Sequence, residues 1–573
     1  MRPSDQALVT RPWLFAACVV VLLKLLLTSH AETIYDGWDA FGYVASAAKW
    51  HWGLEYGQYS HIRVPTFNLY IACVNALGLP LRLANELVLV LASLLVARAV
   101  WACGLTRLTA WLAFALLTLH PWTFKLFSAL VPDGLYATLL VAFIASLVLL
   151  TRDLQEWQAR RDAGDSASRF RTAATLVRIV TPACLLAALA GTWRQESVVL
   201  VVPCVVAWCA ALWHRSAGRF RVQPVVVATL LLLVAPLASI AALNHAYAFI
   251  NFRTIGLYAP ADFLAPGYAR LHKALLSIPP TPRDITPKIH APADVRQRAY
   301  EVSPALALLK PWLEGDTLAR YAPLVRDVSP HRDEYGAWLV WGLREAAFRY
   351  KAWPNAGELD RFFAQAADEI RTAQRERRLE RRFAPFSVIA PQWRGFLREL
   401  PESASQSWTI STGPSSLFKA HGIVLDPYGR ALFDRVTLRR TGLDEPDASE
   451  PAQSARRDVL WHNQRIRAKL DAVWSSWNNI HGRVLAWGWW LPLIALAGWL
   501  WHAARTRSVS LVAVFLACAV ITALARFTLV CLLDASGVWS QHRYLLAFSM
   551  LSDLAMLLAL ATTIREARNW LHR

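Results

Sequence analysis

Long apolar runs alternate with short basic segments along most of this chain, and one polar stretch of more than two hundred residues interrupts them. A helix of about 20 apolar residues crosses the roughly 30 Å hydrocarbon layer of a bilayer. The pattern therefore predicts an all-α polytopic membrane protein with about ten transmembrane helices. The expected spans are 12–28, 83–103, 108–120, 132–150, 179–192, 197–213, 225–245, 484–501, 510–533 and 544–563.

The arginine residues between these runs predict how the spans are oriented. Cytoplasmic loops carry an excess of Lys and Arg, and the segment 151–178 alone contains six arginines. The run 66–79 is marginally long for a span, and a crossing there would place Arg98 and Arg107 outside. We therefore expect an interfacial helix at 66–79, with both termini cytoplasmic and the long polar stretch on the outer side.

This topology divides the chain into three parts. They are an N-terminal membrane module, 1–245, with an outer loop at 30–82; an extracytoplasmic domain, 246–480; and a C-terminal transmembrane module, 481–573.

The extracytoplasmic insert is rich in proline and charge and lacks the period-two alternation of strands. Between 358 and 380, apolar residues recur at three- and four-residue steps opposite a charged face, which predicts an amphipathic helix. We expect a mainly helical insert, with 440–457 as a linker. The apolar positions of that helix are Phe363, Ala366, Ile370 and Ala373.

The composition supports a membrane protein and excludes other classes. Hydrophobic residues make up 55% of the chain, which contains 27 tryptophans, and this is too apolar for a soluble multidomain protein. The net charge of +19 fits basic cytoplasmic loops, and no nucleic-acid-binding signature is present, so we expect no nucleic acid partner. All eight cysteines lie in apolar segments, which excludes a disulfide framework in the insert. The abundance of Arg, Ala, Leu and Trp indicates a GC-rich bacterium, and hence its cytoplasmic (inner) membrane.

Charged residues from five separate connections between spans fall on the outer face of this topology. A charge kept on the less favoured side at the end of a span is a candidate site residue. The residues are Asp36, Asp39, Arg63, Asp133, Arg194, Glu196, His542 and Arg543.

These residue types suit group transfer from a phosphate. A carboxylate beside apolar walls gains proton affinity and can act as a base, and arginine presents a planar fork of donors to phosphate oxygens. Structural roles remain open for several of them. Asp36 or Asp39 can cap a helix that begins near residue 40, Asp133 suits the first turn of a helix, and Arg194 can pair with Glu196.

Several of these positions occur in short motifs that resemble the GT-C glycosyltransferases, which include the aminoarabinose transferases and protein mannosyltransferases. Asp39-Ala-Phe-Gly-Tyr43 in the first outer loop is similar to the D-x-x-x-Y signature of that superfamily. The resemblance covers roughly 12–245 and 484–563, while the insert matches no known pattern. The further motifs are Arg63-Val-Pro65, Leu81-Arg82-Leu83-Ala-Asn85, Pro132-Asp133-Gly-Leu-Tyr136, Arg194-Gln-Glu196 and His542-Arg543-Tyr544.

The resemblance implies an inverting transfer of a sugar from a polyprenyl-phosphate donor to an acceptor hydroxyl on a lipid, glycan or protein, at the periplasmic or extracellular face of the bilayer. Asp39 is the expected catalytic base, with Asp36 in reserve because the sequence D-G-W-D leaves the register ambiguous. The donor phosphate would be bound by Arg63, Arg194 and Arg543, with supporting roles for Tyr43, Asp133, Glu196, His542 and Tyr544.

Cofactor use stays undecided at this point. Some GT-C enzymes bind a divalent metal through an acidic pair in the next outer loop, whereas Asp133 stands alone here. No cofactor is required by the sequence, and Mg or Mn at Asp133 stays an open alternative.

Two other classes of function fit the same apolar pattern. A transporter or flippase of a lipid-linked glycan usually carries charges at mid-span and shows repeated halves. Here the expected mid-spans are nearly free of charge and no repeat is visible. The other alternative is a glycan polymerase or ligase with a basic outer loop, or a non-catalytic assembly scaffold.

Overall fold

The computed structural model describes most of the chain, and within that part it is helical throughout, with no β-strand. The described residues are 11–28, 37–127, 129–162, 168–193, 198–213, 222–281, 288–325, 334–384, 393–412, 427–438, 469, 472–506, 509–537 and 542–571.

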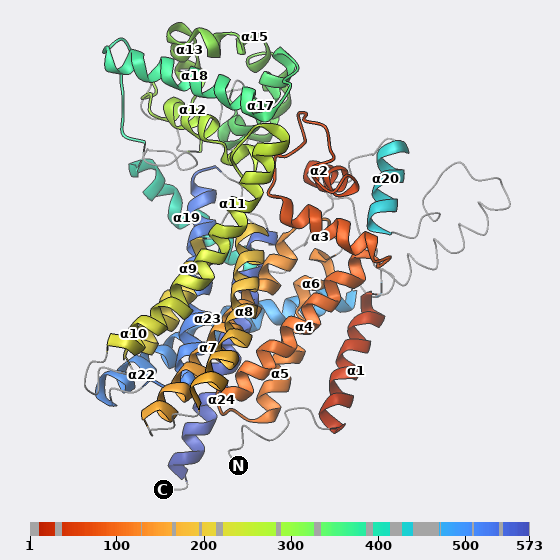
Figure 1. The fold of residues 1–573 in the computed structure, drawn as a ribbon, viewed down its shortest axis with the longest axis vertical. Helices are drawn as coiled ribbons and strands as arrows, with labels where there is room; N and C mark the ends of the chain where they lie inside the picture. Colours follow the sequence, from red (N-terminus) through yellow and green to blue (C-terminus); the bar gives the residue numbers. More distant parts are fainter. Residues whose placement is uncertain are drawn as a thin grey trace, which may run out of the picture.

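A bundle of long helices forms the lower part of the molecule (Figure 1). Six described helices are long and apolar enough to cross a membrane, which confirms the multi-pass character predicted from the sequence. Their bounds are Leu81–Ala102, Asp133–Trp157, Val226–Ile255, Ala472–Thr506, Leu511–Ala535 and Arg543–Arg568, and shorter apolar helices are Pro12–Thr28, Val180–Thr192 and Val198–Trp213. As structural elements the bundle helices are α1 (Arg11–Thr28), α4 (Leu81–Ala102), α5 (Arg107–Thr118), α6 (Pro121–Leu126), α7 (Asp133–Asp162), α8 (Ser168–Trp193), α9 (Val198–Trp213), α10 (Val222–Thr229), α11 (Ala235–Ile255), α22 (Trp490–Thr506), α23 (Leu511–Ala535) and α24 (His542–Leu571).

Helix α7 lies at the centre of this bundle. Its apolar stretch is fully buried, and α7 packs against α4, α8, α23 and α24. Helices at the periphery turn large apolar side chains outward, for example Phe15, Leu22, Ile494 and Leu500. Apolar side chains that face outward from long helices are typical of proteins in a lipid bilayer, because contact with lipid removes these side chains from water without burial against protein.

A second, separate hydrophobic core lies above the bundle in a group of shorter helices, which we call the cap (described residues between 256 and 384). Its largest helices are amphipathic, and α18 buries the four apolar residues that the periodicity singled out. The prediction of a helical insert is confirmed for the cap. The cap helices are α12 (Pro266–Leu276), α13 (Ala293–Val302), α14 (Pro304–Ala307), α15 (Lys310–Leu313), α16 (Asp316–Tyr321), α17 (Leu339–Tyr350) and α18 (Ala356–Arg375).

Helix α11 connects the bundle to the cap (Figure 1). It ends at Gly256, whose φ of 72° is in the left-handed region that glycine adopts at lowest cost. A Cβ on the neighbouring Gly357 would lie 2.4 Å from the Gly256 carbonyl oxygen. The start of α18 therefore packs directly on the end of α11, and side chains at these two positions would separate the helices.

The part of the insert that follows the cap joins the bundle instead. Helix α19 (Trp393–Thr412) packs against α23, and α20 (Pro427–Thr437) packs against α2 (Gly37–Ala48) and α3 (Pro65–Ala76). Phe433, Val436 and Trp474 belong to the bundle core. The cap is thus smaller than the predicted domain 246–480, and the expected linker 440–457 lies outside the described residues.

Helices α2 and α3 lie at the same end of the bundle as the cap, whereas the start of α1 and the end of α24 lie at the opposite end (Figure 1). Helix α3 has 12 residues and is too short to span, in agreement with the interfacial helix expected at 66–79.

Candidate functional site

The candidate site begins with α2 and α3, which flank the turn 49–64. Tyr43 on α2 is buried and packs edge-to-face on Phe67 of α3, with ring centroids 4.9 Å apart. Asp39 lies in the first turn of α2, and its side chain is outside the described part of the structure. Asp36 precedes the described residues of this segment. The fold therefore places the D-x-x-x-Y motif on one short helix at the end of the bundle that faces the cap.

Two buried histidines hold the turn between α2 and α3. His61 Nε2 donates to the Leu54 carbonyl at 3.2 Å, so its Nδ1 accepts from His51 Nε2 at 3.4 Å. Asn68 then donates to His51 Nδ1 at 3.0 Å. Burial lowers the pKa of His51 to about 3 and also lowers the pKa of His61, because an imidazolium would lose its water there.

The backbone at these histidines is itself unusual. Trp50, His51 and His61 have φ values of 50°, 62° and 55°, a region that L-residues occupy at a cost. The neutral hydrogen-bonded chain keeps the turn in this conformation. It thereby fixes the residues that lead into Arg63.

Arg63 connects this turn to α3 and to the cap. Its guanidinium carbon lies 5.4 Å from the ring centroid of Trp341 in α17. Three residues later, Thr66 Oγ1 donates to Thr192 Oγ1 at 2.8 Å and lies 3.1 Å from the Tyr247 hydroxyl oxygen. Thr192 lies near the end of α8, so this hydrogen bond connects the start of α3 to α8. Arg194 and Glu196 lie outside the described part of the chain.

A second group of predicted residues meets where α7 and α24 begin. Asp133, the first residue of α7, is 2% exposed. Arg543 donates to the Tyr544 hydroxyl at 3.2 Å, and its guanidinium carbon lies 5.1 Å from the centroid of that ring. His542 opens α24, with its side chain outside the described set.

Arg526 of α23 joins these two helices and was missed as a site residue by the sequence reasoning. Its Nε donates to the Tyr544 carbonyl at 3.0 Å, and its guanidinium carbon lies 5.3 Å from the ring centroid of Tyr136 on α7. Arg526 is 1% exposed. Its charge inside the apolar run 510–533 is the sequence signal that could have identified it.

The two groups are connected through α4. Tyr70 of α3 donates to Asn85 Oδ1 at 2.9 Å, and Asn85 Nδ2 lies 3.4 Å from the carbonyl oxygen of Phe127, shortly before α7. Asn85 belongs to the motif that begins at Leu81. The structure therefore places Arg63 and Tyr43 in one group and Asp133, Arg543 and Tyr544 in another. Hydrogen bonds through Asn85 connect α3 to the segment before α7.

The cap touches the segments beside both groups. Arg344 of α17 donates to the carbonyls of Gly57 at 2.8 Å and Ser60 at 3.0 Å, and it forms a buried ion pair with Asp262. On the other side, His290 Nε2 donates to the Ser536 carbonyl at 2.8 Å, just after α23. The cap thus covers the end of the bundle where the predicted residues converge.

Charged side chains also lie inside the bundle, contrary to the expectation that the mid-spans are nearly free of charge. Glu86 of α4 pairs with Arg82 at 2.7 Å and with Lys24 of α1 at 3.7 Å, and all three are at most 8% exposed. Lys24 Nζ donates to Thr123 Oγ1 at 2.6 Å. These residues were hidden in runs whose average character is apolar.

Potential metal ligands gather elsewhere. Among the described residues, the one group of three or more His, Cys, Asp or Glu side chains with suitable spacing is His120, His481 and Asp553, and it does not include Asp133.

Comparisons with protein-family models, curated proteins and solved structures gave no match to this chain.

Proposed function

We propose that this protein is a membrane glycosyltransferase of the GT-C type. It would move a sugar from a polyprenyl-phosphate donor to an acceptor hydroxyl on the outer side of a bacterial cytoplasmic membrane. The observation that supports this proposal best is that α2, α3 and the starts of α7 and α24 lie at the end of the bundle that carries the helical cap.

Each part of that arrangement suits one requirement of the reaction. Asp39 would accept the proton of the acceptor hydroxyl as its oxygen attacks the anomeric carbon. The bond between that carbon and the carrier phosphate oxygen breaks, and the phosphate leaves with the electron pair. Arg63, Arg194 and Arg543 would stabilise its charge, because a fixed array of guanidinium groups costs no reorganisation during the reaction.

The cap would supply selectivity and exclude water. It contacts the turn 49–64 through Arg344 and the segment before α24 through His290. Exclusion of water strengthens the attraction between arginine and phosphate and prevents transfer of the sugar to water. The ten-span topology, the cytoplasmic termini and the outward-facing site belong to this proposal.

The test is sugar transfer from polyprenyl-phosphate donors in proteoliposomes, comparing wild type with Asp39→Asn and Asp36→Asn. We expect Asp39→Asn to lose at least about 100-fold in rate, the usual contribution of a general base. Loss in Asp36→Asn alone would move the base to Asp36. Full activity in both variants would contradict the mechanism.

A transporter or flippase of a lipid-linked glycan is the second candidate, and one observation favours it. Buried ionisable side chains inside a bundle, here Lys24, Glu86 and Asp553, are typical of transporters that couple to protons or ions. Translocation of a labelled glycolipid by reconstituted protein, without covalent transfer of its sugar, would support this candidate and reject the first.

A further inference from the structure

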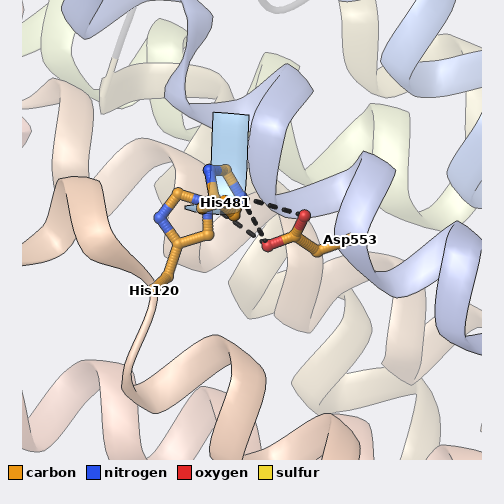
Figure 2. A group of neighbouring side chains, drawn as sticks. All are labelled: His120, His481 and Asp553. Atoms are coloured by element: carbon orange, nitrogen blue, oxygen red, sulfur yellow. Dashed lines mark hydrogen bonds and ion pairs between the residues drawn. The ribbon is translucent and has the colours of Figure 1, made fainter. Parts of the chain in front are cut away.

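Three ionisable side chains from distant parts of the sequence meet inside the bundle (Figure 2). His120 lies between α5 and α6, His481 lies in the helix 472–488, and Asp553 lies in α24. Their exposed fractions are 1%, 7% and 6%. Asp553 is 11 residues from the start of α24, about 16 Å along the helix at 1.5 Å per residue, so the group lies well inside the bundle.

Hydrogen bonds assign a proton to the Nε2 atom of each ring. His481 Nε2 lies 3.0 Å from both carboxylate oxygens of Asp553, so it donates to them. His120 Nδ1 accepts the backbone N–H of Trp122 at 3.3 Å, so its proton is on Nε2, 3.1 Å from Ser549 Oγ and 3.6 Å from Asp553 Oδ2. Both imidazoles therefore turn an N–H toward the acidic side of the group.

His481 Nδ1 is the one ring nitrogen that this arrangement leaves open. The atom is buried and has no hydrogen-bond partner among the described residues. In the tautomer assigned above it carries a lone pair. This lone pair can accept a proton. The imidazolium that results would already have a counter-ion, because His481 donates its other N–H to the Asp553 carboxylate.

A metal ion is the other ligand that two histidines and an aspartate can hold, and their donor atoms lie within 4.8 Å of one another. The hydrogen bonds around these three side chains oppose metal binding. A histidine that binds a metal donates its second N–H to an acceptor. Here His120 Nδ1 accepts the backbone N–H of Trp122, so a metal on His120 Nε2 would place an Nδ1–H against another N–H donor. The geometry therefore favours a proton over a metal.

The charged groups around the site are Asp553 and the neighbouring set of Lys24, Arg82 and Glu86. One carboxylate and two neutral imidazoles carry −1, and the neighbouring set of Lys24, Arg82 and Glu86 carries two positive charges and one negative, or +1. The two sets adjoin through Thr123, which accepts from Lys24 and donates to the His120 carbonyl at 2.7 Å. With neutral histidines these charges sum to zero. An added proton on His481 leaves one net positive charge, and that charge is stabilised locally by the Asp553 carboxylate 3.0 Å away.

We propose that His481, Asp553 and His120 form a proton-binding site inside the bundle, with His481 Nδ1 as the atom that takes up the proton. Uptake converts His481 to an imidazolium that keeps its Nε2–H on Asp553. The proton then strengthens the contact between the helix 472–488 and α24, the helix whose first residues include Arg543 and Tyr544. The site does not depend on glycosyl transfer and would also serve a proton-coupled transporter.

The test uses the full-length protein in lipid nanodiscs with ¹⁵N-labelled histidine, whose imidazole nitrogen signals distinguish neutral from cationic rings. The His481 signal is assigned by its absence in His481→Gln. We expect it to change from the neutral to the cationic form as the pH falls from about 8 to about 5. In Asp553→Asn it should stay neutral over that range, because a buried cation without its partner is unfavourable. Replacement of the exposed His502 by Gln should leave the change intact.

Two results would overturn the proposal. One is a His481 ring that stays neutral throughout in the wild type, or that titrates alike in wild type and Asp553→Asn. The other is about one equivalent of a transition metal per purified chain that is lost in Asp553→Asn. If Asp553→Asn fails to fold, Ser549→Ala removes the acceptor of His120 but leaves the His481–Asp553 pair. The proposal then requires the titration of His481 to persist.

Discussion

Arg296 in the cap and His481 in the bundle are both buried, but their hydrogen bonds are satisfied to different degrees. In the cap, Arg296 donates to Glu314 at 2.8 and 2.9 Å, to Glu334 at 3.4 Å and to the Ala291 carbonyl at 3.1 Å. In the bundle, His481 has one nitrogen on Asp553 and the other without a partner. A buried cation whose donors all have acceptors stabilises a fold, whereas a buried neutral imidazole with an unpartnered nitrogen is available to bind a proton.

The largest effect is expected where the cap holds the outer loop. Arg344→Met leaves Asp262 as an uncompensated buried charge and removes the donors to Gly57 and Ser60. We expect a loss of about 3–5 kcal/mol in the free energy of unfolding. Denaturant unfolding in detergent micelles measures it.

The matched control is Arg349→Ala on the same helix. Arg349 is partly exposed and pairs with Glu345 at 3.2 Å, and the buried Glu345 keeps a second partner, Arg320, at 3.0 Å. Removal of Arg349 should therefore cost below about 1 kcal/mol. Equal effects of the two substitutions would show that Arg344 does not hold the loop against the cap.

The second prediction concerns pH and the turn 49–64. The pKa of His51 is about 3 in the folded protein, against 6.5 ordinarily, so the unfolded chain binds more protons between these values. Stability is therefore complete above pH 6.5 and falls as the pH drops toward 3, at about 1.4 kcal/mol per pH unit. Unfolding between pH 7 and pH 4 measures this slope.

His51→Gln is the control for this pH dependence, because glutamine cannot be protonated in that range. The variant should have a shallower slope than the wild type. Identical slopes would assign the acid sensitivity to other groups and remove the case for a neutral histidine chain in the turn.

The smallest of these effects tests the cap by itself. Asn355 Oδ1 accepts the Glu358 N–H at 3.0 Å and so caps α18. Asn355→Ala should cost about 1 kcal/mol. In the exposed middle of the same helix, Gln365→Ala should change stability by less than about 0.5 kcal/mol. If Asn355→Ala leaves the free energy of unfolding unchanged, packing alone fixes the start of α18.

The contrast between cap and bundle also explains how much of the fold could be predicted. The cap faces water, so α18 shows a 3.6-residue period, and its buried face followed from the positions of Phe363, Ala366 and Ile370. The long apolar runs predicted the membrane-crossing helices by length alone. In the bundle, where both lipid and protein favour apolar side chains, the same runs gave no information on which faces meet.

The site could be predicted only in part, for the same reason. Arginines at span ends such as Arg194 and Arg543 are visible in the sequence because they oppose the positive-inside bias. His120, His481 and Asp553 are separated by hundreds of residues, so only the three-dimensional structure brings them together. The unusual backbone of His51 and His61 has no sequence signature comparable to a glycine.

Native mass spectrometry of the purified protein, wild type beside Asp39→Asn, tests the central claim most directly. We expect a bound polyprenyl phosphate whose additional mass fits a sugar, and we expect the sugar-bearing form to accumulate in Asp39→Asn because the donor binds but is not consumed. Absence of a carrier lipid from both proteins would contradict the glycosyltransferase proposal.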